Sequence, residues 1–165
     1  MDRFFAAFDL TKPIGMRDFA IARCMADMAL RRMEVVRLQL GSFDWSNGTL
    51  TLTHNQSGRE CKLPLRVQTA HALVRYLQYG RPHTSNRAVF VRQIAPYDKP
   101  SDAVAINHLI RGTFVRAGLD DRFHGVHVLR RTAATRLIQG GASLKEVADV
   151  LGRFTPGLIL IVCVR

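Results

Sequence analysis

Apolar residues between positions 16 and 40 recur at the three- and four-residue spacing of an amphipathic helix. The stretch contains no glycine or proline that would interrupt a helix. The apolar positions that share a face are Phe19, Ala20, Cys24 and Met28, followed by Val35 and Leu38. The pattern predicts two helices, or one helix that bends near Leu30.

The next segment alternates apolar and polar residues with the two-residue period of a half-buried strand. Residues 49–54 (TLTLTH) show this alternation after a turn at 44–48 (DWSNG). A second turn at 55–59 (NQSGR) leads into a returning run at 60–65 (ECKLPL). The two runs therefore predict a β-hairpin, and residues 87–91 (RAVFV) predict a third short strand.

Three further segments have a helical pattern and end at glycine, which favours the position just after a helix. They cover residues 68–80, 102–118 and 128–139, and the glycines are Gly80, Gly118 and the pair Gly140 and Gly141.

A last short helix is predicted from residue 143 onward. Ser143 and Glu146 have the spacing of a capping box, in which each side chain bonds the backbone of the other residue. The residues expected to face the core are Leu144, Val147 and Leu151. The order of all elements predicts one mainly α domain with a small three-stranded antiparallel sheet.

Composition and charge point to a nucleic-acid partner. The chain has 165 residues, of which 47% are hydrophobic, so it can bury a core of its own. Its formal net charge is +11, with twenty arginines and only four lysines. Because guanidinium groups match phosphate oxygens in a bidentate geometry, a basic domain of this kind is a candidate for binding nucleic acid.

Other sequence features indicate an intracellular setting. Cys24, Cys61 and Cys163 are far apart and odd in number, so buried free thiols are expected instead of a disulfide framework. The first ten residues do not resemble a signal peptide, and no apolar run reaches the length of a membrane span. The expected localisation is cytoplasmic, and nucleoid-associated when the protein is bound to DNA.

The stretch HVLRRT (127–132) places a histidine and an arginine on one helix face. His127 and Arg130 are three residues apart, near the start of the predicted helix, where backbone N–H groups favour an anion. The arrangement is suited to a phosphate, although two solvated side chains on a surface helix would give the same pattern.

A second arginine–acid pair lies in the stretch ALRRMEVVRL (29–38). Arg31 and Glu34 are three residues apart among apolar neighbours, so Arg31 is expected to be partly buried and to need a carboxylate partner. The pair either has a purely structural role, or it presents a second phosphate-binding arginine that Glu34 steadies.

These stretches, in this order, resemble the catalytic domain of the tyrosine recombinases, the phage-integrase family. That family has an Arg-x-x-Glu helix, a hairpin ending in Pro-Leu, a His-x-Leu-Arg-His-Thr helix, and a helix ending in Leu-Gly-His. The resemblance covers about residues 15–152 and runs through GTLTLTHNQSGRECKLPL and HVLRRTAATRLIQGGASLKEVADVLG. It implies the fold of the DNA breaking–rejoining enzymes.

The resemblance also implies a reaction. In this family a tyrosine oxygen attacks a DNA phosphodiester and forms a 3′-phosphotyrosyl link, without a metal, ATP or another cofactor. Two arginines stabilise the charge that develops on the phosphate oxygens. By resemblance Arg31 and Arg130 are these arginines, His127 transfers protons, and Glu34 supports the site.

Three positions depart from the family pattern. Gln56 stands at the hairpin lysine position, and an amide cannot act as a general acid. Arg153 replaces the histidine of Leu-Gly-His, and Val162 occupies the position of the tyrosine nucleophile. A milder change is Arg131, which stands where the family often has a second histidine.

Substitutes for the missing groups are not evident in the sequence. Arg59 holds its proton too tightly to replace the lysine, and Lys62 lies on the other strand of the hairpin. The tyrosines of the chain, Tyr76, Tyr79 and Tyr97, lie far upstream of the nucleophile position.

The resemblance gives a domain division. Residues 1–14 are expected to be a linker or the remnant of an N-terminal region, and 15–152 the catalytic domain. Residues 153–165 form an apolar tail without the nucleophile segment, which a shift of reading frame near codon 152 would explain. The chain is therefore expected to be a truncated, degenerate recombinase.

The expected function is site-specific DNA recombination or integration at the level of the family, with this chain a catalytically impaired remnant that still binds DNA. The expected partners are double-stranded DNA and other recombinase subunits, with no membrane, metal or small-molecule cofactor. One alternative is a non-catalytic helix-turn-helix regulator, although TPGLILIVCVR lacks the polar recognition helix that such a module needs. A metal nuclease is a weaker alternative, because no acidic or histidine cluster has ligand spacing.

Overall fold

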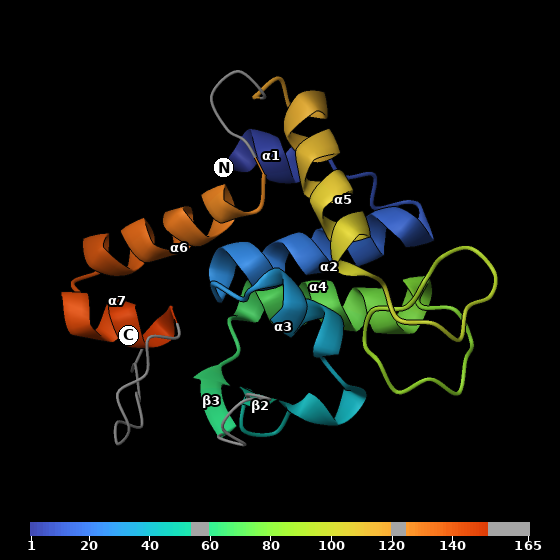
Figure 1. Ribbon diagram of the computed structural model, residues 1–165, viewed down its shortest axis with the longest axis horizontal. Helices are drawn as coiled ribbons and strands as arrows, with labels where there is room; N and C mark the ends of the chain where they lie inside the picture. Colours follow the sequence, from blue (N-terminus) through green and yellow to red (C-terminus); the bar gives the residue numbers. More distant parts are fainter. Residues whose placement is uncertain (54–59, 120–124, 152–165) are drawn as a thin grey trace.

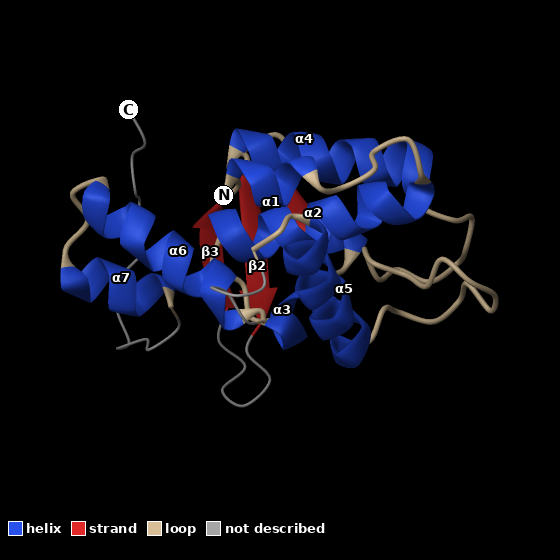
Figure 2. Ribbon diagram, turned by 90° about the horizontal axis from the view of Figure 1, so that it is seen from above, coloured by secondary structure: helices blue, strands red, loops and turns tan. Residues whose placement is uncertain are grey.

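The computed structural model describes residues 1–53, 60–119 and 125–151. In chain order the elements are α1 (Asp2–Ala6), α2 (Pro13–Asp27), α3 (Arg32–Arg37), the 3₁₀ turn η1 (Leu40–Ser42), β1 (Phe43–Asp44), β2 (Thr49–Thr53), β3 (Glu60–Pro64), α4 (Val67–Arg75), the π-helical turn η2 (Tyr76–Gly80), α5 (Ala103–Arg116), α6 (His127–Gln139) and α7 (Leu144–Val150). Figures 1 and 2 show α6 and α7 at one end of the molecule and the loop after η2 at the other. The prediction of a mainly helical domain with a three-stranded antiparallel sheet is confirmed.

Helix α2 lies at the centre of the core. It contacts α3, α4, η2, α5 and α6, and small residues on several of its faces allow these elements to approach closely. Its fully buried residues are Ala20, Ile21, Ala22, Cys24, Met25 and Ala26. The predicted core face of this helix is therefore confirmed, although burial extends well beyond it.

The first helix belongs to the same core. Phe4 of α1 is fully buried, and its ring centroid lies 4.6 Å from that of Phe114 on α5. Burying one such side chain stabilises a fold by about 2–3 kcal/mol. The N-terminal residues thus help to hold α5 against α2.

Of the two predicted alternatives, two helices or one helix bent near Leu30, the structure has two helices. The backbone of Ala29 has a φ of 55°, in the left-handed region that a non-glycine residue rarely adopts. The chain then becomes extended at Arg31, which precedes the first residue of α3. The expectation that Arg31 lies inside a helix was wrong, because the break leaves it at the cap position just before α3, where its side chain is 46% exposed.

The sheet consists of the predicted hairpin and one short strand before it. Strand β2 pairs antiparallel with β3, with Leu50 opposite Leu63 and Leu52 opposite Cys61. Strand β1 pairs with the other edge of β2, so the strand order is β1-β2-β3. Leu50 and Leu52 point into the core, as the alternating pattern predicted.

Residues 87–91 are not the third strand, and that part of the prediction was wrong. Val89, Phe90 and Val91 are fully buried, so their apolar character comes from the core and not from a sheet face. The backbone of this run makes only isolated bridges, from Ala88 to Gln39 and from Val91 to Pro100. The third strand is β1 instead.

The two C-terminal helices lie where the sequence predicted them, but one residue expected in the core is exposed. The Ser143 hydroxyl donates to the Glu146 carboxylate at 2.8 Å, and the Glu146 N–H donates to the Ser143 hydroxyl at 3.3 Å, so the capping box is present. Val147 is buried and Leu151 half-buried. Leu144 is 78% exposed, contrary to expectation, because the buried contact of this seven-residue helix is made one turn later by Val147.

Several predicted positions lie outside the described residues: Gln56 and Arg59 within 54–59, and Arg153, Val162 and Cys163 within 152–165. Among the described cysteines, Cys24 is buried and Cys61 half-buried, and both are free thiols. No helix within the described ranges is long and apolar enough to cross a bilayer.

Candidate functional site

Arg31 is held by Glu34 at the start of α3. The Glu34 carboxylate accepts a hydrogen bond from the Arg31 backbone N–H at 2.6 Å and contacts the Arg31 guanidinium at 3.3 Å. One carboxylate therefore fixes both the backbone and the side chain of the arginine. The pair predicted from the sequence is present, in a cap geometry instead of on a helix face.

Arg130 reaches the same region from α6. One of its terminal nitrogens donates to the Ala29 carbonyl oxygen, in the break between α2 and α3. The other donates to the Leu151 carbonyl oxygen at 3.0 Å. Arg130 is thus anchored to a segment only two residues away from Arg31.

The two guanidinium groups meet at one oxygen atom. Arg31 Nη2 also donates to the Leu151 carbonyl oxygen, at 3.1 Å. Partial burial lowers the pKa of Arg130 from its usual value, the nearby Arg31 cation lowers it further, and Glu34 acts in the opposite direction. Two cations that converge on one oxygen form a site that favours an anion. We refer to Arg31 and Arg130 as the arginine pair.

His127 lies one helical turn before Arg130 and is the first residue of α6. Its side chain is exposed. Val126 precedes the helix and provides no side-chain cap, so the first N–H groups of α6 are not bonded by a capping side chain. The predicted histidine and helix start are therefore both at the end of α6 that carries Arg130.

Strand β3 of the hairpin carries a thiol that is sensitive to the Glu34 charge. Burial raises the pKa of the Cys61 thiol on β3, and the Glu34 carboxylate raises it further. Lys62 follows Cys61 on this strand and is exposed, opposite Thr51 of β2. The family's lysine position, Gln56, lies outside the described residues.

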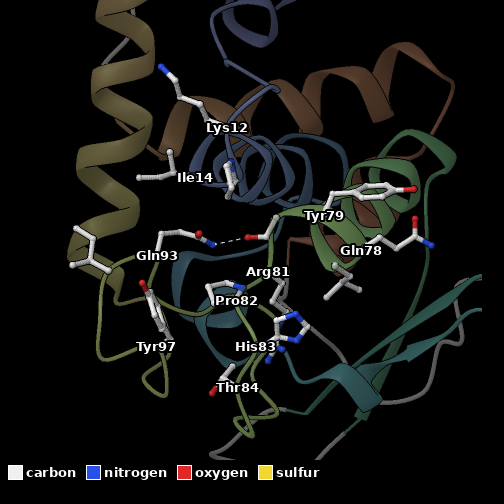
Figure 3. Close-up of a pocket in the computed structure, with 14 residues that line it drawn as sticks. Lys12, Ile14, Gln78, Tyr79, Arg81, Pro82, His83, Thr84, Gln93 and Tyr97 are labelled. Atoms are coloured by element: carbon white, nitrogen blue, oxygen red, sulfur yellow. Dashed lines mark hydrogen bonds between the residues drawn. The ribbon is translucent and has the colours of Figure 1, made fainter.

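The three tyrosines lie elsewhere in the described structure. Tyr76 is fully buried, stacks on Phe90, and has a pKa raised by burial. Tyr79 and Tyr97 line an open pocket of about 920 Å³ that none of the predicted site residues lines (Figure 3). That pocket is built from η2, the start of α2 and the loop after η2, at the end of the molecule opposite α6 (Figures 1 and 3).

Two functional groups of the site were not predictable from residue types. The carbonyl oxygens of Ala29 and Leu151 orient the arginine pair, and any residue carries such an oxygen. The only sequence signal for Ala29 is its place near the predicted bend. Leu151 was predicted for its apolar side chain and not for its backbone.

Comparison with known proteins gives a family match over most of the chain. Residues 1–153 match the family model described as "Phage integrase family". The chain is 34% identical over 152 residues to y4rA of Sinorhizobium fredii (strain NBRC 101917 / NGR234), covering 92% of this chain and 37% of that protein. It is 32% identical over 141 residues to y4gC of the same strain, covering 85% of this chain and 72% of that protein. The names of both relatives describe integrase/recombinase proteins.

Solved structures share the fold. The XerA recombinase superimposes with a TM-score of 0.78 at 23% identity, over 93% of this chain and 54% of that one. The Tn1549 transposon integrase in complex with transposon right end DNA gives a TM-score of 0.71 at 17% identity, over 92% of this chain and 55% of that one. The chain thus spans about half the length of these solved relatives. The family match, the y4gC relative and the fold together show that this chain belongs to the phage integrase family, the tyrosine recombinases.

Proposed function

We propose that the arginine pair binds one phosphodiester group of double-stranded DNA. The observation that supports this most directly is the convergence of Arg31 Nη2 and Arg130 Nη2 on the single Leu151 carbonyl oxygen. A non-bridging phosphate oxygen is an acceptor of the same kind, and its negative charge makes it the stronger partner for two guanidinium groups. The net charge of +11 would add long-range attraction to the same polyanion.

Within the family such a site serves tyrosine-type strand transfer, in which the arginines stabilise the charge that develops on the phosphate. For this chain we propose binding without cleavage. Val162 carries no oxygen that could attack phosphorus, and Gln56 carries no proton that it could give to a leaving group. His127 would hydrogen-bond the bound phosphate from the start of α6. Assembly with other recombinase subunits remains a prediction of the family resemblance.

Binding to a fluorescent duplex, measured by anisotropy over a salt series, tests this function. Arg31→Gln and Arg130→Gln should each weaken binding about tenfold and lower the slope of log affinity against log salt by about one. Arg111→Gln is the matched control, because it removes the same charge from an exposed position on α5. It should change the affinity by no more than about twofold, since exposed charges act through screened, long-range attraction.

Equal effects of all three variants would contradict a specific phosphate site and would leave only general attraction by a basic surface. Strong preference for one duplex sequence, unaffected by Arg31→Gln and Arg130→Gln, would instead favour the helix-turn-helix alternative.

A further inference from the structure

A buried acid at the end of α2 has no part in the proposed phosphate contacts. Asp27 is the last residue of α2, and its side chain is only 4% exposed. It precedes by two residues Ala29, whose carbonyl oxygen accepts a hydrogen bond from Arg130. A carboxylate at such a depth is retained only when charged or polar partners compensate for its lost hydration.

The partners of Asp27 come from three helices. Arg23, one turn earlier on α2, contacts one carboxylate oxygen at 3.4 Å, and the Thr69 hydroxyl of α4 donates to the same oxygen at 3.1 Å. Arg136 of α6 contacts the other carboxylate oxygen at 3.5 Å. One acid therefore joins the end of α2 to α4 on one side and to α6 on the other.

The side of Asp27 that faces α4 is rigidly supported. The Arg23 guanidinium lies 3.9 Å from the centre of the Phe5 ring and donates to the Gln68 side chain at 2.9 Å. These contacts fix Arg23 from α1 and α4. The Asp27 carboxylate is thus held in place on this side, and its contact with Arg136 links it to α6.

Helix α6 packs on α2 with few fully buried side chains, and Val128 adds a partly buried one. Of its thirteen residues, only Leu129 and Ala133 are buried. Arg130, Ala133 and Arg136 are spaced three residues apart, so each is a neighbour of the next along the helix surface, and both arginines reach the end of α2. Two polar contacts hold α6 on α2. Arg130 donates to the Ala29 carbonyl oxygen and Arg136 contacts the Asp27 carboxylate, so both contacts reach the same short segment at the end of α2.

We infer that Asp27 is a positioning residue for the arginine pair, acting through Arg136 to set the rotation and axial position of α6. The inference rests on the proposed function, because its consequence is the distance between Arg130 and Arg31. Without the carboxylate, Arg136 loses its anchor, α6 is free to shift on its two buried residues, and Arg130 no longer meets Arg31 at one oxygen. Small displacements of a preorganised site reduce its affinity strongly.

Asp27→Asn should change the DNA-binding affinity in one direction if Asp27 positions α6, and in the other direction if only general electrostatic attraction matters. The substitution keeps the size of the side chain and raises the net charge of the protein by one. Long-range attraction alone would therefore make DNA binding slightly tighter. A positioning role predicts the opposite, a weakening of roughly threefold to tenfold, in the range of coupling between residues of one network.

The experiment measures duplex affinity by anisotropy for Asp27→Asn, Arg136→Gln and Thr69→Val, at a temperature at which circular dichroism shows each variant folded. Thr69→Val is the matched control, because it removes a hydrogen bond to the same carboxylate from the side that faces α4. It should lower the melting temperature while leaving the affinity within about twofold. Asp27→Asn and Arg136→Gln should both weaken binding, and the double variant should bind no more weakly than the worse single variant.

Each variant is also combined with Arg130→Gln. If Asp27 acts through Arg130, then Asp27→Asn should cause no further loss in that background. Additive losses for Asp27→Asn and Arg136→Gln would mean that Arg136 contacts DNA directly, and would overturn the inference. So would unchanged or tighter binding by folded Asp27→Asn when Arg130→Gln alone weakens binding.

A failure of the proposed function would give a different result, because Arg130→Gln by itself would then leave the duplex affinity unchanged. If Asp27→Asn does not fold, Arg136→Gln and the charge-retaining Arg136→Lys still decide the question, since Arg136 is 43% exposed. Normal affinity in Arg136→Gln would then overturn the inference.

Discussion

Arg31 and Arg130 donate to the same carbonyl oxygen, that of Leu151, at 3.1 and 3.0 Å. The oxygen lies 120 residues after the first arginine and 21 residues after the second, so three separate parts of the chain meet there. The arrangement brings two cations together without a salt bridge between Arg130 and an acid among the described residues. Glu34 offsets part of the resulting repulsion, and a phosphate bound as proposed would relieve the rest.

Ala29→Gly should stabilise the protein. Ala29 has a φ of 55°, which strains an alanine by about 1–2 kcal/mol, while glycine adopts it freely but has more entropy to lose on folding. We expect a net gain of about 0.5–1 kcal/mol in the free energy of urea-induced unfolding. Ala105→Gly, at an exposed position in α5, is the control and should cost about 0.5–1 kcal/mol. A loss of stability in Ala29→Gly would show that the left-handed backbone is not strained.

Ser143→Ala should weaken the start of α7. The substitution removes a hydroxyl that bonds both the carboxylate and the backbone N–H of Glu146. The expected cost is about 1 kcal/mol, the usual value for losing an N-cap. Amide hydrogen exchange in α7 should accelerate while exchange in α2 stays slow. Equal acceleration in both helices would mean that α7 unfolds only together with the core.

The turn before β2 should depend on pH in a known direction. Hydrogen bonds from Asn47, first from its side chain and then from its backbone, together with one from Ser46, lower the pKa of Asp44 to about 2. Because the folded pKa lies below the unfolded value of about 4, the carboxylate supports the turn above pH 4. That support is lost as the pH falls from about 4 through about 2.

Nuclear magnetic resonance checks this prediction through the Asn47 backbone amide, whose shift should titrate with a midpoint near 2. Asp44→Asn should abolish the titration. A midpoint near 4 would show that the hydrogen bonds do not persist in solution.

The unmodified chain should form no covalent adduct with a nicked duplex that traps cleavage intermediates. Val162 cannot attack, and Tyr76 is buried beneath Phe90. Val162→Tyr alone should also fail, because Gln56 still leaves the departing oxygen without a proton donor. Removing several members of a catalytic unit is not additive, so single repairs recover little.

The measurement is a protein–DNA band that resists denaturation. We expect such a band only when residues 153–165 are replaced by the tail of an active relative together with Gln56→Lys. An adduct of the unmodified chain would contradict the prediction and would direct attention to Tyr79 and Tyr97, which are exposed.

The sequence by itself determined most of the elements and the identity of the charged residues. Periodicity identified the hairpin and the helices from α2 onward, but not α1, because a helix or strand that buries one face must repeat its apolar residues with its own period. Helical spacing likewise predicted that His127 and Arg130 lie one turn apart at the start of one helix. Residues 88–91 are an exception to this reasoning, since a run of buried residues has no polar face that would reveal its conformation.

Only the tertiary structure decided how the site is assembled. Its decisive contacts use the backbone oxygens of Ala29 and Leu151, which leave no trace in residue type. The left-handed break at Ala29, which moved Arg31 from a helix to a cap, is imposed by packing against the preference of alanine. Asp27 is similar, because its role depends on partners from three helices that only the folded core brings together.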